Sequence, residues 1–209
     1  MPAADDELKL YFDYKSPFAY LAMAPALDLP LRYAVRLRPL PFLLRIKGKG
    51  ERSVYSEWKV RYSYMDARRW ANRRGGLVIK GPPKIYDSSP ALIGGLFAQQ
   101  QGGFREYSLE VFRRFFERRL EIDRADEIGA LLEELGHSQA DWRAFLEGPG
   151  PDRLERSIDE GHEDHVFGVP IFVFRGELFW GYDRMPLLEE RLLAARLARE
   201  TGGADGRNA

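Results

Sequence analysis

The stretch FDYKSPFAYL, residues 12–21, decides the fold, because a strand pattern changes to a helix pattern within it. The residues LKLYFDY at 8–14 predict a short buried strand. Ser16 and Pro17 then predict a helix start, since serine caps helices and proline fits the first helical position. The apolar pattern FAYLAMAPALD continues this helix, with Pro25 marking a kink or its last turn.

Strand patterns recur on both sides of a long central segment. LRYAVRLRPL at 31–40 alternates apolar and polar residues and predicts a half-buried strand, joined to the first strand by a helical crossover that suits parallel pairing. Near the other end, 166–182 predicts a hairpin with its turn at Arg175-Gly176. Asp183 predicts the start of a last helix, whose apolar face would be formed by Leu187, Leu188, Leu192 and Ala195.

The central segment carries helix patterns and no strand pattern. Its first part has apolar residues at helical spacing in an Arg-rich run that ends near Gly75-Gly76, namely Tyr55, Trp58, Tyr62 and Met65. GPPKIYDSSP at 81–90 predicts an irregular connection. Further helices are predicted at 89–101, 104–121, 125–135, 138–147 and 151–162.

This element order predicts an α/β, thioredoxin-like fold (β-α-β … β-β-α) with a large all-helical insertion between its two halves. The expected boundaries are a thioredoxin-like domain at 1–48 and 163–201, and a helical insertion domain at 49–162. The polar residues 202–209 are expected to form a flexible tail.

Composition limits the function classes. The 209 residues include 32 Lys plus Arg and 32 Asp plus Glu, so no net charge favours nucleic acid or an anionic membrane. There is no cysteine, which excludes disulfide exchange, thiolate nucleophiles and cysteine metal sites. The start, MPAADDELK, lacks the parts of a secretory signal, and no apolar run reaches the roughly 20 residues that span a bilayer. We expect a soluble, cytoplasmic protein without nucleic-acid or membrane partners.

Three separated motifs resemble one family. FDYKSPFAYLA resembles the opening motif of the 2-hydroxychromene-2-carboxylate isomerases and the related kappa-class glutathione transferases, in the DsbA-like branch of the thioredoxin superfamily. KVRYSYMDARRWA at 59–71 resembles their first insertion helix, with Lys59, Tyr62 and Asp66 at the family's spacing. The stretch 166–192, with FGVP and FWGYDR, resembles their C-terminal block. The loop LPFLLRIKGKGERS departs from the family, because it lacks the Gly-Asn pair.

The resemblance implies that glutathione is the cofactor. Ser16, at the helix start, would donate a hydrogen bond to the glutathione thiolate and so lower the thiol pKa. The peptide bond before Pro170 would be cis, and the backbone of Val169 would pair with the tripeptide as a short added strand does. From the residues alone, Ser16 could equally be a helix cap and Pro170 an ordinary trans proline.

The same resemblance places the two ends of the tripeptide. Asp183 would bind the γ-glutamyl ammonium, and helix-start amides near Tyr182 would bind the γ-glutamyl carboxylate. Lys59 would reach the glycine carboxylate or a substrate carboxylate. The plainer readings are a helix cap for Asp183 and a solvated surface residue for Lys59.

A small aromatic substrate would need an apolar pocket. The aromatic residues that we expect to line it are Tyr14, Phe18, Trp58, Tyr62 and Trp180. No metal site is expected, because His162 and His165 have the spacing of solvated residues at a helix end.

The implied activity is the conversion of 2-hydroxychromene-2-carboxylate to trans-o-hydroxybenzylidenepyruvate, a step in the breakdown of naphthalene. The thiolate would add to the conjugated double bond and leave after rotation. Two alternatives stay open: a kappa-like glutathione transferase that conjugates small electrophiles, and a redox-inactive thioredoxin-fold module that binds a partner without chemistry. The family also implies a homodimer.

Overall fold

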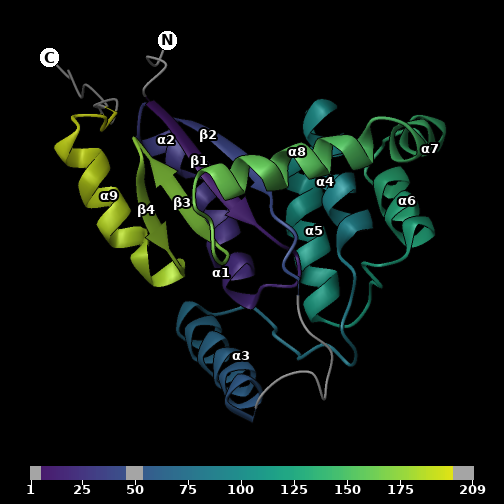
Figure 1. The fold of residues 1–209 in the computed structure, drawn as a ribbon, viewed down its shortest axis with the longest axis horizontal. Coiled ribbons are helices and arrows are strands. Elements are labelled where there is room, and N and C mark those ends of the chain that lie inside the picture. Colours follow the sequence, from purple (N-terminus) through teal and green to yellow (C-terminus); the bar gives the residue numbers. More distant parts are fainter. Residues whose placement is uncertain (1–5, 46–53, 200–209) are drawn as a thin grey trace, which may run out of the picture.

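The computed structural model describes residues 6–45 and 54–199, so residues 46–53 of the loop LPFLLRIKGKGERS and the predicted tail at 202–209 lie outside the described residues. The elements in chain order (Figure 1) are β1 (Glu7–Phe12), α1 (Pro17–Leu27), α2 (Leu29–Arg32), β2 (Arg36–Pro41), α3 (Val54–Arg74), α4 (Ser89–Gln100), α5 (Phe104–Phe116), α6 (Ala125–Glu134), α7 (Gln139–Glu147), α8 (Gly150–Glu163), β3 (Ile171–Phe174), β4 (Glu177–Trp180), a 3₁₀ turn (Tyr182–Arg184) and α9 (Met185–Ala194).

The four strands form one mixed sheet in the order β2-β1-β3-β4. β1 pairs in parallel with β2, which α1 reaches by a crossover, and antiparallel with β3. β3 and β4 form the predicted hairpin, and positive φ angles at Arg175 (49°) and Gly176 (79°) give it a tight two-residue turn. The predicted α/β thioredoxin-like fold is confirmed.

Alternation along the strands gives the sheet two covered faces. Leu8, Leu10 and Phe12 of β1 join a large hydrophobic cluster with α1, α5 and α9. Tyr11, one residue out of phase, joins a smaller cluster with Val169 and Ile171. Figure 1 shows α8 crossing the front of the sheet and α1 behind it. The sheet is therefore held between helices, which fixes the loops at its ends.

Ion pairs attach α8 to the sheet. Lys9 Nζ lies 2.7 Å from Asp164 and 2.8 Å from Glu160, and Arg38 of β2 donates two hydrogen bonds of 2.6 Å to Glu160. Tyr11 donates a 2.5 Å hydrogen bond to Asp164. Because α8 leads directly into the segment before β3, these contacts fix the position of that segment.

The helical segment has two parts. In Figure 1, α4 to α8 pack together beside the sheet, whereas α3 lies apart from them, near α1. Tyr20 of α1 stacks on Phe112 and Phe116 of α5 at 5.5 and 5.3 Å. Arg74 at the end of α3 donates a 2.6 Å hydrogen bond to the carbonyl of Leu21. α1 is therefore the element that joins the sheet to both parts.

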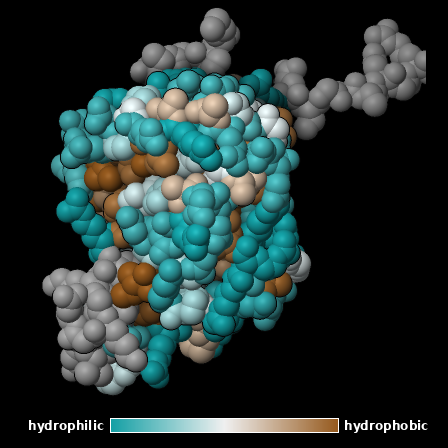
Figure 2. Space-filling view, turned by 90° about the vertical axis from the view of Figure 1, so that its right-hand side faces the viewer, coloured by the Kyte–Doolittle hydropathy of each residue, from teal (hydrophilic) through white to brown (hydrophobic). Residues whose placement is uncertain are grey.

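The outer face of the helical segment is mainly hydrophilic, with separate apolar patches (Figure 2). No helix among the described residues is long and apolar enough to cross a membrane.

Three predicted elements have wrong boundaries. The hairpin predicted from residue 166 has its first strand only from Ile171, because Pro170 has no N–H to donate to a ladder. The strand predicted at 31–40 starts only at Arg36, because Pro30 in a helical first turn lets α2 form, and Leu31 is 74% exposed. The helix predicted at 104–121 ends at Phe116. There Arg118 takes a positive φ of 61°, and the carbonyl of Phe116 accepts a hydrogen bond from Lys80 N instead.

The start of the last helix also differs from the prediction. Asp183 lies in the 3₁₀ turn, and its side chain caps no helix; α9 begins at Met185, with a proline in its first turn. The buried face of α9 is formed by Met185, Leu188 and Leu192, whereas Leu187 is 49% exposed. The prediction that Leu187 shares the apolar face of this helix with Leu188 and Leu192 is therefore wrong.

Candidate active site

Ser16 joins the start of α1 to the segment before β3. Its Oγ accepts a 3.2 Å hydrogen bond from Ala19 N–H, as a helix cap does, and donates a 3.1 Å hydrogen bond to the carbonyl of Val169. Pro17 occupies the first turn, as predicted. The cap is therefore real, and it holds the hydroxyl at the positive end of the helix dipole.

The peptide bond between Val169 and Pro170 is cis, as predicted. The hydrogen bond from Ser16 shows that this segment lies directly against the start of α1, although the two are 153 residues apart. Gly168 permits a close approach, since a Cβ there would lie 2.8 Å from Trp180 Nε1. Trp180 in turn meets Phe167 edge-on at 5.0 Å.

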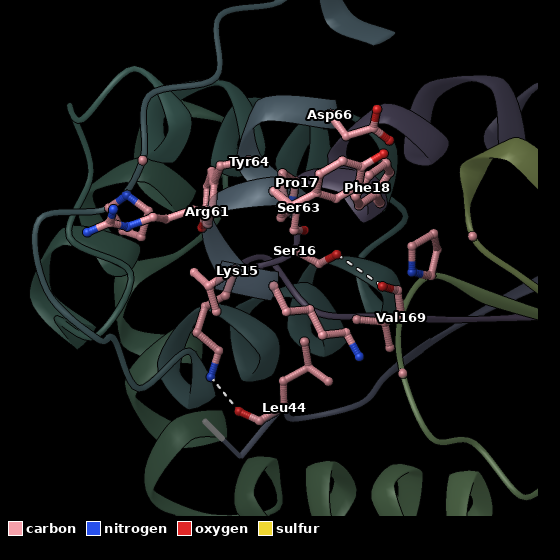
Figure 3. A pocket seen from close by; sticks show the side chains of 18 of the residues that line it. Lys15, Ser16, Pro17, Phe18, Leu44, Arg61, Ser63, Tyr64, Asp66 and Val169 are labelled. Atoms are coloured by element: carbon pink, nitrogen blue, oxygen red, sulfur yellow. Dashed lines mark hydrogen bonds between the residues drawn. The ribbon is translucent and has the colours of Figure 1, made fainter. Parts of the chain in front are cut away.

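A cavity of about 1240 Å³ opens in front of Ser16. Its walls come from the turn between β1 and α1, from α3, from residues 81–86 and from both sides of the β3–β4 hairpin. Figure 3 shows Ser16 and Val169 facing one another, with Lys15 and Leu44 on a neighbouring wall. The predicted site residues that it brings together are Ser16, Phe18, Lys59, Tyr62, Val169, Pro170, Trp180 and Asp183.

Three predicted site residues do not line this cavity. Tyr14 is fully buried in the core, where its hydroxyl and that of Ser108 are 2.8 Å apart. Its position in the turn after β1 directs it into the core, so its prediction as a pocket residue is wrong. Trp58 lies on α3 with 59% of its surface exposed, outside the lining. Tyr182 packs edge-on against Trp70 at 5.5 Å.

Sequence reasoning missed other parts of the wall. Arg61, Ser63 and Tyr64 of α3 line the cavity, although only Lys59 and Tyr62 were singled out from the residues around them. Ile85 and Tyr86 line it from a segment that we interpreted only as an irregular connection. Their signal was the apolar content of GPPKIY, which is unusual for a solvated loop.

The cavity carries charges of both signs. Asp183 Oδ2 accepts a 2.5 Å hydrogen bond from Arg184, and Lys59 and Arg61 add cations from α3. Lys84 instead pairs with Glu121 and Asp123 at 2.9 Å each, and these contacts raise the pKa of Lys84. Burial raises the pKa of Tyr64 to about 12, so its hydroxyl stays protonated near neutral pH.

The surroundings of Ser16 limit its chemistry. Both hydrogen-bond partners of its Oγ are backbone groups, and no histidine is among the lining residues. A serine nucleophile needs an adjacent base, which these partners do not supply. The hydroxyl can, however, donate a hydrogen bond to an anion that reaches the start of α1.

The chain belongs to the DSBA-like thioredoxin domain family, whose model matches residues 7–193. Within that class it is similar to 2-hydroxychromene-2-carboxylate isomerases. It is 28% identical over 198 residues to the one from Pseudomonas putida, with 91% of this chain and 95% of that protein covered. It is 25% identical over 194 residues to the one from Sphingobium xenophagum, with coverages of 89% and 97%.

Solved structures agree on the fold. A 2-hydroxychromene-2-carboxylate isomerase superposes with a TM-score of 0.76 at 24% identity, covering 91% of this chain and 96% of the other. A probable DsbA oxidoreductase from Streptomyces coelicolor superposes with a TM-score of 0.75 at 15% identity, with coverages of 91% and 89%. Because this chain has no cysteine, it cannot carry out thiol–disulfide exchange.

Proposed function

We propose that this protein is a glutathione-dependent isomerase of the 2-hydroxychromene-2-carboxylate type, acting in the cytoplasm as a homodimer. The observation that carries the proposal is the contact of 3.1 Å between Ser16 Oγ and the carbonyl of Val169, next to a cis proline and facing a large cavity. The relatives named 2-hydroxychromene-2-carboxylate isomerase match about nine-tenths of the chain, which supports the isomerase part of the proposal.

The residues of the cavity fit glutathione. The tripeptide has two carboxylates, one ammonium and one thiol, so it needs cations, an anion and a donor for the thiolate. Lys59 and Arg61 supply cations, Asp183 supplies a carboxylate, and Ser16 supplies the donor. The carbonyl of Val169 is within reach of the same groove, where a peptide backbone would run.

In this mechanism Ser16 stabilises the ionised sulfur. When bound, glutathione would supply the nucleophilic thiolate, whose reversible addition to a conjugated double bond leaves a single bond about which the substrate can rotate. The Ser16 hydroxyl would turn from Val169 to the sulfur and, with the amides at the start of α1, favour the ionised form. The phenol of Tyr64 and the cations of α3 would stabilise negative charge that develops on the substrate oxygen.

Calorimetry and an isomerisation assay test this function. The protein should bind glutathione, and it should convert the substrate only when glutathione is present. S-methylglutathione should bind and compete, because it keeps the peptide, but it should support no turnover, because it has no thiol. No binding of glutathione at millimolar concentration would reject the proposal and favour the redox-inactive binding module.

One observation favours a second candidate, the kappa-like transferase. The cavity of about 1240 Å³ exceeds the roughly 300–1,000 Å³ of most small-molecule sites, so it has room for varied electrophiles beside the tripeptide. The transferase would use the same thiolate but would release a stable conjugate.

A further inference from the structure

Asp13 and Lys15 flank Tyr14 in the turn that leads from β1 to Ser16, and the proposed reaction gives them no role. Both side chains are buried: Asp13 is 0% exposed and Lys15 is 8% exposed. Buried charges are costly unless they are paired and hydrogen-bonded. Two such residues immediately before the candidate catalytic serine therefore need an explanation.

Their partners lie on one residue beyond β2. Asp13 Oδ2 accepts a 2.8 Å hydrogen bond from Leu44 N–H. Lys15 Nζ donates a 2.8 Å hydrogen bond to the carbonyl of Leu44, which Figure 3 shows. The ammonium also lies 3.5 Å from Asp13 Oδ2. The ion pair thus holds both backbone polar groups of Leu44.

The ion pair takes the place of the β1–β2 ladder, which ends just before Leu44. The ladder between β1 and β2 closes with Phe42 N–H donating to the carbonyl of Phe12 at 2.8 Å. Beyond Phe42 the chain leaves the sheet, and the ion pair supplies the partners that a strand would have supplied. Leu44 then lines the cavity.

Asp13 connects the same contact to Ser16. Its carbonyl accepts a 3.0 Å hydrogen bond from Ser16 N–H, and its Oδ1 accepts one of 3.0 Å from Lys15 N–H. A displacement of the Asp13 side chain would therefore move the turn that carries the hydroxyl. Active sites respond strongly to such shifts, since a misplacement of about 1 Å can cost about 100-fold in rate.

We propose that Asp13 and Lys15 form a buried clamp on the backbone of Leu44, which positions the turn of Ser16 and the Leu44 wall of the cavity relative to one another. Lys15 is thus a positioning residue for the reaction. Its effect on the rate rests on the proposed function.

The groups around Asp13 set the pH dependence of the clamp. Burial raises the pKa of Asp13, while Lys15 and the backbone N–H groups oppose that rise. The other groups that face it are the hydroxyl of Ser88 and the phenols of Tyr14 and Tyr64, and the pKa values of both phenols are raised by burial. Lys15 is therefore the cation that offsets the Asp13 carboxylate.

Lys15→Met removes the ammonium and keeps most of the side-chain length. The pKa of Asp13 then rises further, so the folded state favours the protonated acid. A group whose pKa is raised on folding stabilises the protein at low pH, and this stability is lost as the pH rises through the folded pKa. The variant should therefore lose more stability, relative to the wild type, at pH 8 than at pH 5. Asp13→Asn/Lys15→Met, with no charge left, should lack this pH dependence.

Hydrogen exchange and kinetics test the clamp, at a temperature at which circular dichroism shows each variant to be folded. In Lys15→Met the amides of Leu44 and Ser16 should exchange at least about 10-fold faster, and kcat should fall by about 10- to 100-fold with little change in the glutathione Kd. Arg199→Met is the matched control, because the exposed Arg199 also donates to backbone carbonyls, those of Pro30 and Tyr33 at 2.9 and 3.2 Å, and does not line the cavity.

Two results would overturn the proposal. One is unchanged exchange at Leu44 and Ser16 in Lys15→Met. The other is a lower Tm with unchanged kcat, which would make the pair merely structural. Failure of the proposed function is a separate result: if the wild type does not bind glutathione, the exchange of Leu44 and Ser16 still decides whether the clamp exists.

Discussion

At the scale of single residues, a substitution can separate the helix cap that Ser16 forms from the chemical role that we propose for it. Ser16→Ala removes the cap on α1, at a cost of about 1 kcal/mol of stability, and it removes the donor for the thiolate. Losing one donor of the oxyanion-hole kind lowers kcat by about 10²–10³-fold. We therefore expect a modest loss of stability with a large loss of activity, measured by thermal unfolding and steady-state kinetics.

Ser138→Ala is the matched control for this variant. Ser138 caps α7, where its Oγ accepts a 3.2 Å hydrogen bond from Asp141 N–H, and it does not line the cavity. It should show the same loss of stability with full activity. If Ser16→Ala behaves in the same way as this control, Ser16 is only a cap.

At the scale of elements, residues 79–86 form a strap between α3 and the end of α5. Arg68 of α3 donates a 2.8 Å hydrogen bond to the carbonyl of Ile79. Arg118, just beyond α5, donates two to the carbonyl of Gly81, at 2.9 and 2.6 Å. Because Ile85 and Tyr86 follow in the same segment, these contacts hold one wall of the cavity, against which we propose that the second substrate binds.

Arg118→Ala should therefore raise the KM of the second substrate by about 10-fold, which corresponds to about 1.4 kcal/mol. The glutathione Kd should stay unchanged, because the contacts proposed for the tripeptide lie on other walls. Arg199→Ala is the control, since Arg199 also donates to backbone carbonyls, those of Pro30 and Tyr33, at 2.9 and 3.2 Å. An equal effect of both substitutions on KM would argue against a specific role of the strap.

The same scale shows what the sequence could predict. The hairpin and the helix that Ser16 starts were predicted correctly, because their signals are local: turn residues, capping and alternation. The end of α5 was predicted wrongly, because it depends on Lys80 N–H, from a distant segment, donating a hydrogen bond to the carbonyl of Phe116. The start of β2 was also wrong, because the alternating apolar and polar residues from Leu31 onward fit a strand, although Leu31 is exposed and lies in the helical turn α2.

In the candidate site, too, features that follow from local motifs were predicted and features that depend on tertiary packing were not. The nearness of Ser16 and Val169 followed from the motifs that carry the resemblance, and the cis bond before Pro170 was predicted with it. The contribution of Tyr64 and Ile85 could not be predicted, because it depends on how α3 and the strap pack around the cavity. The spacing of residues along one helix shows which side chains share a face, but it does not show which other elements pack against that face.

At the scale of the whole molecule, carboxylates held by arginines make stability fall in acid. Hydrogen bonds from Arg32 lower the pKa of Glu189, and those from Arg113 lower the pKa of Glu110. A carboxyl whose pKa is lowered on folding stabilises the protein above its unfolded pKa, and this stability is lost as the pH falls through the folded pKa. Because these groups are partly exposed, each contributes less than about 1 kcal/mol.

Denaturant unfolding should thus show a decline that begins near pH 4.5, the ordinary pKa of Glu189 and Glu110, and continues below it. Glu189→Gln should lower stability at pH 6 and reduce the slope in acid, whereas the exposed Glu190→Gln should change neither. A stability that stays constant from pH 6 to pH 3.5 would contradict this prediction.

The balance of glutathione over many turnovers distinguishes the two candidate enzymes. In an isomerase the thiolate leaves the substrate within the same cavity, so each cycle returns the thiol unchanged. A hydrogen bond from Ser16 to the sulfur is compatible with both outcomes, because it favours the thiolate as attacking group and equally as leaving group. We expect the free thiol concentration to stay constant while substrate is converted, and the product mass to equal the substrate mass. Thiol titration and mass spectrometry of one reaction measure both quantities. A loss of one thiol per product, with a product heavier by one glutathione, would identify a transferase instead.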